Sequence, residues 1–124
     1  MKPSIERLHD AMGELIYAVA KADGLIQESE MQKLEEILQK HPWASNIHWS
    51  FNYEQNRNNS LEEAYTKALE TCKEYGPSEE YEFLFEVLYE IAKASNGLNA
   101  EEAQLIVRFK LDLKEHFMQL DMEE

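Results

Sequence analysis

The chain has 124 residues, 44% of them hydrophobic, which suits one domain with a buried core. Its 25 acidic and 12 basic residues give a formal net charge of −13, which argues against binding to nucleic acid or to anionic membrane surfaces. This charge favours cations or basic protein partners as ligands, or it serves solubility alone.

The sequence lacks the signals of export and of membrane insertion. No apolar run is long enough to span a bilayer, and the first residues lack the apolar segment of a signal peptide. The single cysteine, Cys72, has no partner for an internal disulfide, as is usual in a reducing compartment. We therefore expect a soluble cytoplasmic protein.

The first third of the chain predicts two helices joined by a tight turn. Residues 4–22 form the first helix, with Ser4 as its N-cap and Gly24 as its stop signal. Residues 28–40 form the second helix, which ends before Pro42. Apolar residues recur at three- and four-residue steps in both: Ile5, Leu8, Met12, Leu15, Ile16 and Val19, then Met31, Leu34, Ile37 and Leu38.

Residues 42–59 are rich in asparagine yet contain four aromatic residues. A disordered linker is poor in aromatics. We therefore expect an ordered, irregular loop, in which a short turn of helix could form, packed on the rest of the domain. Its aromatic residues either fill the core or line a groove for a protein partner: Trp43, Trp49, Phe51 and Tyr53.

The second half predicts three more helices. A capping box at Ser60–Glu63 opens one helix, and Gly76 closes it. Residues 79–94 form the next helix, after Ser78. A second capping box at residues 99–102 opens a last helix that runs to about residue 120. No segment alternates as a strand would.

These elements indicate an all-α fold. The single domain, residues 1–124, is expected to be a bundle of about five main helices, built from two pseudo-repeated helix-turn-helix pairs with one further helix between them.

The two copies of the repeat align without a gap. Residues 17–30 align with residues 89–102 at an offset of 72, so that Ala20-Lys21-Ala22 meets Ala92-Lys93-Ala94. Glu30 aligns with Glu102, while Asp23 aligns with Ser95. Each copy predicts a helix, a turn with short polar side chains, and a new helix, so any binding chemistry is expected at the turns.

The first turn matches only the second half of a calcium-binding EF-hand loop. Asp23, Gly24, Ile26 and Glu30 fit positions five, six, eight and twelve. Val19 and Lys21 would occupy positions one and three, where neither can bind calcium. An ordinary EF-hand is therefore excluded.

The stretch Ala20-Lys21-Ala22-Asp23-Gly24, followed by Ile26 and Glu30, resembles the signature of the TerB-like family, which is named for tellurite resistance. The resemblance covers most of the chain and includes a second, degenerate copy of the motif. It implies an all-helical fold, no catalytic activity, and a divalent metal ion bound by acidic turn residues. Carried over by position, the candidate ligands are Asp23, Glu30, Asn96 and Glu102.

Two or three carboxylates form a hard, oxygen-rich site, which suits Ca²⁺ or Mg²⁺ rather than zinc. If the repeat brings the two turns together, the four candidate ligands could share one ion. In the alternative interpretation the acidic residues only stabilise helix starts: Glu30 lies at the positive end of a helix dipole, and Glu102 completes a capping box. The protein is then an interaction module without metal.

No catalytic motif is recognisable. The four histidines show no ligand-like spacing, and Cys72 lies on an apolar stripe, as a core residue would. An enzyme would require His48, Glu30 and the aromatic segment to converge in one deep pocket. We therefore expect a non-catalytic domain that binds either an ion or a protein.

Overall fold

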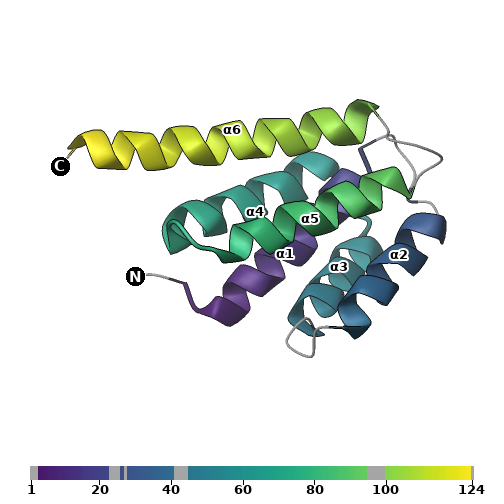
Figure 1. Ribbon diagram of the computed structural model, residues 1–124. Coiled ribbons are helices and arrows are strands. Elements are labelled where there is room, and N and C mark those ends of the chain that lie inside the picture. The colour runs from purple at the N-terminus through teal and green to yellow at the C-terminus, as the bar shows by residue number, and fades with distance from the viewer. Residues whose placement is uncertain (1–2, 23–25, 27, 41–44, 95–99, 124) are drawn as a thin grey trace.

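Figure 1 shows the computed structural model, which describes residues 3–22, 26, 28–40, 45–94 and 100–123. These residues form helices and no strands, so the fold is all-α. The helices are α1 (Ile5–Ala20), α2 (Glu28–Gln39), α3 (Ser45–Arg57), α4 (Leu61–Tyr75), α5 (Glu80–Lys93) and α6 (Ala100–Glu123).

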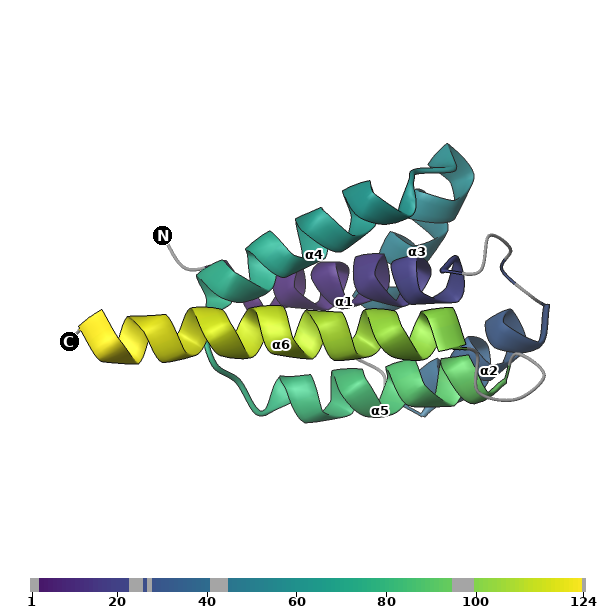
Figure 2. The same ribbon diagram turned by 90° about the horizontal axis from the view of Figure 1, so that it is seen from above.

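Helix α1 is the centre of the molecule. It contacts α3, α4, α5 and α6, and Figures 1 and 2 show it enclosed by its neighbours. Ten consecutive residues from Ala11 to Ala20 are buried, so all sides of this helix face protein rather than one apolar stripe alone. The long α6 crosses one side of the bundle, against α4 and α5 (Figure 2).

The expectation of an irregular segment at residues 42–59 is wrong for most of its length, because α3 occupies Ser45–Arg57. Its buried residues are Ile47, Ser50, Phe51 and Glu54, at the three- and four-residue steps of a helix face. Two of these four are polar, and this hides the helical pattern from a search for apolar stripes. The helix count is therefore six rather than five in the described part of the chain.

The close packing of α3 against α1 depends on Gly13. A Cβ atom at this position would lie 2.8 Å from the Cβ of Ser50 and 3.0 Å from the backbone nitrogen of Phe51. It would also collide with the carbonyl oxygen of Ile47. The hydroxyl of Ser50 donates a 2.6 Å hydrogen bond to the carbonyl oxygen of Asp10 on α1. The two backbones therefore meet at van der Waals distance.

The predicted helix starts at Ser4 and Ser60 are confirmed. Each serine hydroxyl accepts a hydrogen bond from the backbone N–H three residues on, at 3.1 Å for Ser4 and 3.2 Å for Ser60. Gly76 ends α4 with a φ of 94°, a conformation that favours glycine. The apolar residues predicted to face inward in the first two helices are buried or partly buried, except Ile5, which is 40% exposed.

Candidate functional site

The two turns of the sequence repeat join helices whose ends gather at one end of the molecule. The last turns of α1 and α5 and the first turns of α2 and α6 all lie at this end, opposite the two chain termini (Figures 1 and 2). The candidate ligands Asp23 and Asn96 lie outside the described residues. Glu30 and Glu102 are described.

Glu30 and Glu102 are both enclosed by protein. Glu30, in the first turn of α2, is 1% exposed, and Glu102, in the first turn of α6, is 0% exposed. Glu30 precedes the buried Leu34 by four residues, and Glu102 precedes the buried Ile106 by four. Both carboxylates therefore lie on the core-facing side of their helices.

Burial extends the correspondence between the two halves beyond the sequence motif. At the same offset of 72 residues, apolar side chains are buried in both halves at five aligned pairs before the turns and at one pair after them. These pairs are Met12–Leu84, Leu15–Val87, Ile16–Leu88, Val19–Ile91, Ala20–Ala92 and Leu34–Ile106. The two acids thus hold equivalent places in similar surroundings.

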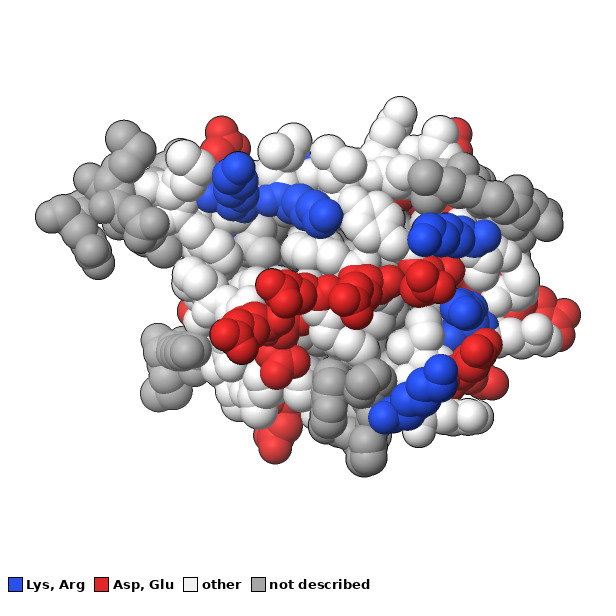
Figure 3. All heavy atoms as spheres, viewed as in Figure 1, with Lys and Arg blue, Asp and Glu red and all other residues white. Residues whose placement is uncertain are grey.

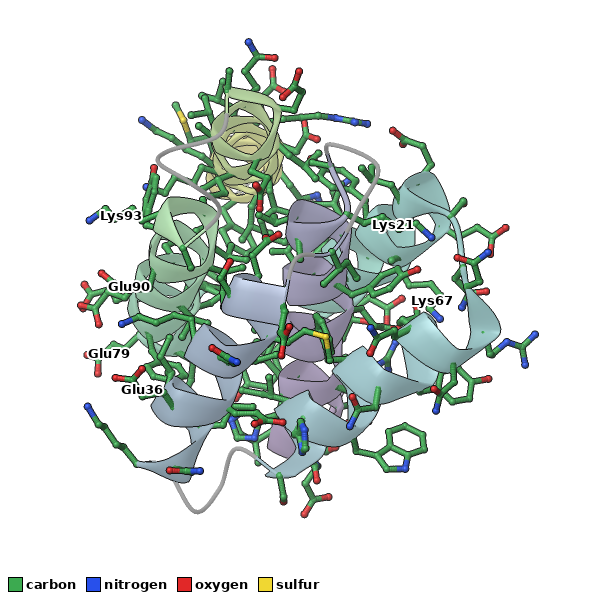
Figure 4. The ribbon with its side chains drawn as sticks, turned by 90° about the vertical axis from the view of Figure 1, so that its right-hand side faces the viewer. Lys21, Glu36, Lys67, Glu79, Glu90 and Lys93 are labelled. Carbon is green, nitrogen blue, oxygen red and sulfur yellow. The ribbon has the colours of Figure 1, made fainter. Side chains whose placement is uncertain are left out.

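The lysines of the repeated motif are held by partners of their own. Lys21 Nζ donates to Asn58 Oδ1 at 2.7 Å and to the hydroxyl of Tyr17 at 2.9 Å. Lys93 Nζ lies 3.9 Å from a carboxylate oxygen of Glu90 on the surface. Figure 4 shows the two ammonium groups on opposite sides of the molecule. Each lysine is therefore tied to its own side of the bundle.

The described residues alone do not assemble a metal site. Within residues 3–22, 26, 28–40, 45–94 and 100–123, no group of three or more His, Cys, Asp or Glu side chains is placed to hold an ion. Two of the four proposed ligands belong to the remaining residues. The two described candidate ligands, Glu30 and Glu102, are buried carboxylates, and carboxylate oxygens are ligands that Ca²⁺ and Mg²⁺ prefer.

The aromatic residues of α3 divide between core and surface. Phe51 is 2% exposed and packs edge-on against Tyr17, so it fills the core. Trp49 is 62% exposed and stacks on Tyr53, which is 40% exposed, with their ring centroids 5.3 Å apart. Trp43 lies outside the described residues. The structure therefore places Phe51 in the core and Trp49 with Tyr53 on the surface.

His48 and Phe51 border a shared cavity, but it measures only about 20 Å³, about the size of one water molecule. Glu30 is not among the residues that line it. Among the described residues, this cavity therefore joins His48 with Phe51 but not with Glu30. Cys72 is a buried core residue as expected, and burial raises the pKa of its thiol to about 12.

An ionic cluster that the sequence analysis did not identify joins three helices. Lys67 Nζ of α4 lies 2.7 Å from a carboxylate oxygen of Glu54 on α3 and 3.4 Å from one of Glu14 on α1. Arg7 also pairs with Glu14, at 3.3 Å, and the Asn59 amide donates to Glu54. The only sequence signal was the presence of Glu14 within the apolar segment of α1.

Comparison with protein families identifies the family of the chain. A family model described as tellurite resistance protein TerB matches residues 9–115. The chain belongs to the TerB family. The match covers most of the central helix α1, the sequence of both repeated turns and most of α6. No curated protein and no solved structure matches the chain.

The TerB domain therefore accounts for nearly the whole chain. In the part of it that the structure describes, no helix is both long and apolar enough to cross a membrane.

Proposed function

We propose that this TerB-family chain is a non-catalytic binding domain and that its ligand is one divalent cation, held where the two repeated turns meet. The observation that supports this most directly is the complete burial of Glu30 and Glu102, the acids that align across the repeat. A role in tellurite resistance or a related stress response, in the cytoplasm, belongs to the same proposal.

The physical argument starts from the cost of burying charge. A carboxylate removed from water is unfavourable unless hydrogen bonds or a cation compensate it. Glu30 and Glu102 both have interaction partners within the protein, and one divalent ion between the two carboxylates would compensate their charge further. Such oxygen ligands select Ca²⁺ or Mg²⁺ over zinc. Asp23, Asn96, backbone carbonyls and water would supply the remaining ligands.

A single shared ion fits the sequence better than two separate sites. Asp23 has Ser95 as its counterpart, so the second turn lacks the acid that the first one has. Glu30 and Glu102 are the acids common to both halves. We therefore propose that each half contributes one buried carboxylate to the same ion.

Thermal unfolding with Ca²⁺, Mg²⁺ and EDTA tests this proposal. At an ion concentration about 100 times Kd, binding to the folded state adds about 2.7 kcal/mol. For a chain of this size, we expect the midpoint of unfolding to rise by roughly 5–10 °C above its value in EDTA. The Asp23→Asn/Glu30→Gln variant should lose this rise.

Matched controls are available on the same helix turns. Glu28 and Glu101 are exposed acids in the first turns of α2 and α6, so Glu28→Gln and Glu101→Gln change the same charge at the same helix ends. These variants should keep the full ion-dependent rise. The proposal fails if millimolar Ca²⁺ and Mg²⁺ leave the wild-type midpoint where EDTA leaves it.

The second candidate function is a protein-interaction module in which the acidic residues serve only the helix starts. It is favoured by the location of Glu30 and Glu102 in first helical turns, where a carboxylate stabilises a helix by about 0.3–1 kcal/mol. The exposed Trp49–Tyr53 stack would then be part of the binding surface. In this case Glu30→Gln and Glu102→Gln shift the unfolding midpoint equally with and without ions.

A further inference from the structure

A groove between α2 and α5 has the form of a docking site, separate from the turns discussed above. The groove has a volume of about 330 Å³. Three apolar side chains lie along it: Ile37 from α2, and Phe83 and Val87 from α5. Lys33 and Glu90 approach each other across it to 3.7 Å. Figure 1 shows that the two helices run in opposite directions.

The α5 side of this groove carries a row of acidic residues. Glu79, Glu82, Glu86 and Glu90 follow one another at steps of three, four and four residues, which places them on one face of the helix. Figure 3 shows a continuous band of acidic side chains over α5. Figure 4 shows Glu36 of α2 on the same edge of the molecule as Glu79 and Glu90.

Most of this acidic row has no basic partner among the residues that the structure describes. Glu90 pairs with Lys33 and with Lys93, at 3.7 and 3.9 Å. Glu79, Glu82 and Glu86 are exposed and form no ion pair with any residue that the structure describes. Like charges four residues apart destabilise a helix by about 0.2–0.5 kcal/mol per pair. Glu82 lies in the first turn of α5, where the helix dipole offsets this repulsion, so the row as a whole adds little to the stability of α5.

We propose that the groove binds a basic amphipathic helix of a partner protein. The apolar side chains of that helix would contact the half-buried Ile37 and Phe83, while Val87, only 2% exposed, completes the floor of the groove. The lysine or arginine residues of the helix would face the acidic row. A helix lying along α5 repeats its side chains at the same three- and four-residue steps as the row itself. The net charge of −13 attracts such a partner from a distance.

The opposite wall fixes the orientation of the partner. Lys33 and Lys40 of α2 also line the groove, so its rim is acidic along α5 and partly basic along α2. A helix that is basic on every side would meet repulsion at α2. The preferred partner therefore has its basic residues along one edge of its apolar face, and neutral or acidic residues along the other.

Binding of synthetic peptides measured by fluorescence anisotropy tests this proposal, at an ionic strength of about 0.15 M and in EDTA. The probe is a peptide of about 18 residues, long enough to form a helix, with a leucine face and lysines along one edge. A peptide of the same composition in scrambled order measures attraction by charge alone.

The matched variants are two pairs of exposed glutamates with the same spacing. Glu82→Gln/Glu86→Gln removes the centre of the acidic row, and Glu70→Gln/Glu74→Gln removes two exposed acids from α4. We expect the first variant to bind the amphipathic peptide about tenfold more weakly, which corresponds to about 1.4 kcal/mol. The second variant should stay within about twofold of wild type, because long-range charge alone changes little at this ionic strength.

The first variant should unfold close to the wild-type temperature, because the repulsion that it relieves along α5 and the helix-dipole stabilisation that it removes at Glu82 are of similar size. Amide shifts in NMR spectra should cluster at residues 33–40 and 83–90. Equal losses in both variants, or equal binding of the scrambled peptide, would overturn the proposal. So would shifts that cluster around Trp49 and Tyr53, since the docking surface would then be α3.

Discussion

At the scale of single residues, Glu14 is a buried carboxyl group outside the repeated turns, and it is paired with Arg7 and Lys67. Burial raises the pKa of its carboxyl group above 4.5, although Arg7 and Lys67 act in the opposite direction. The neighbouring Glu54 adds to the rise. The folded protein thus holds the Glu14 proton more tightly than the unfolded chain does. This residue contributes less stability as the pH rises above about 4.5.

Comparison of wild type with Glu14→Gln isolates this effect, because glutamine keeps the shape and cannot ionise. We expect the free energy of unfolding of wild type to fall relative to that of the variant as the pH rises from about 4 to 7. Urea unfolding at several pH values measures the difference, and Glu70→Gln corrects for the change in net charge. The opposite result would be a free energy of unfolding that rises with pH in wild type relative to Glu14→Gln. It would show that the ion pairs with Arg7 and Lys67 affect the pKa of Glu14 more strongly than its burial does.

For Glu30 and Glu102, the sequence predicted one property and missed another. The aligned acids could be found from the sequence, because the motif repeats without a gap. Their complete burial could not be predicted from the sequence, because a glutamate in a first helical turn is usually exposed. Extending the alignment to Leu34 and Ile106 would have given the missing signal, since each apolar residue follows its acid by four positions.

At the scale of elements, α3 is the helix that was not predicted from the sequence. The other five helices follow apolar stripes and serine caps that are readable in the sequence. In α3 the core-facing positions include Ser50 and Glu54, whose burial depends on partners in α1 and α4. Tertiary contacts that lie far apart in sequence thus decide whether this segment is helical.

The contact of α1 with α3 leads to a prediction for Gly13→Ala. In an ordinary helix this substitution stabilises by about 1 kcal/mol. Here the added methyl group collides with backbone atoms of α3 that cannot rotate away, and overpacking of this kind costs about 1–3 kcal/mol. The two effects together predict a net loss of up to roughly 2 kcal/mol in urea unfolding. A gain in stability would mean that α3 does not approach α1 at Gly13.

At the scale of the whole molecule, the bundle separates two surfaces with different chemistry. The first turns of α2 and α6 each hold one buried carboxylate, Glu30 and Glu102, while the α2–α5 face carries a groove beside exposed acids. The two carboxylates are shielded from water, as the proposed ion requires. The groove is open to solvent, as the proposed docking of a helix requires. A helix bundle can carry both because its helix ends and its helix faces are different surfaces.

The central claim is that the two halves of the chain share one divalent ion through Glu30 and Glu102. The number of ions bound per chain tests this claim most directly. After dialysis against Ca²⁺ or Mg²⁺, metal content should be one ion per wild-type chain. Glu30→Gln and Glu102→Gln should each reduce it to none, because one ion needs both carboxylates. Wild-type protein that retains no ion would contradict the claim. So would single variants that retain the ion, since the two halves would then not share it.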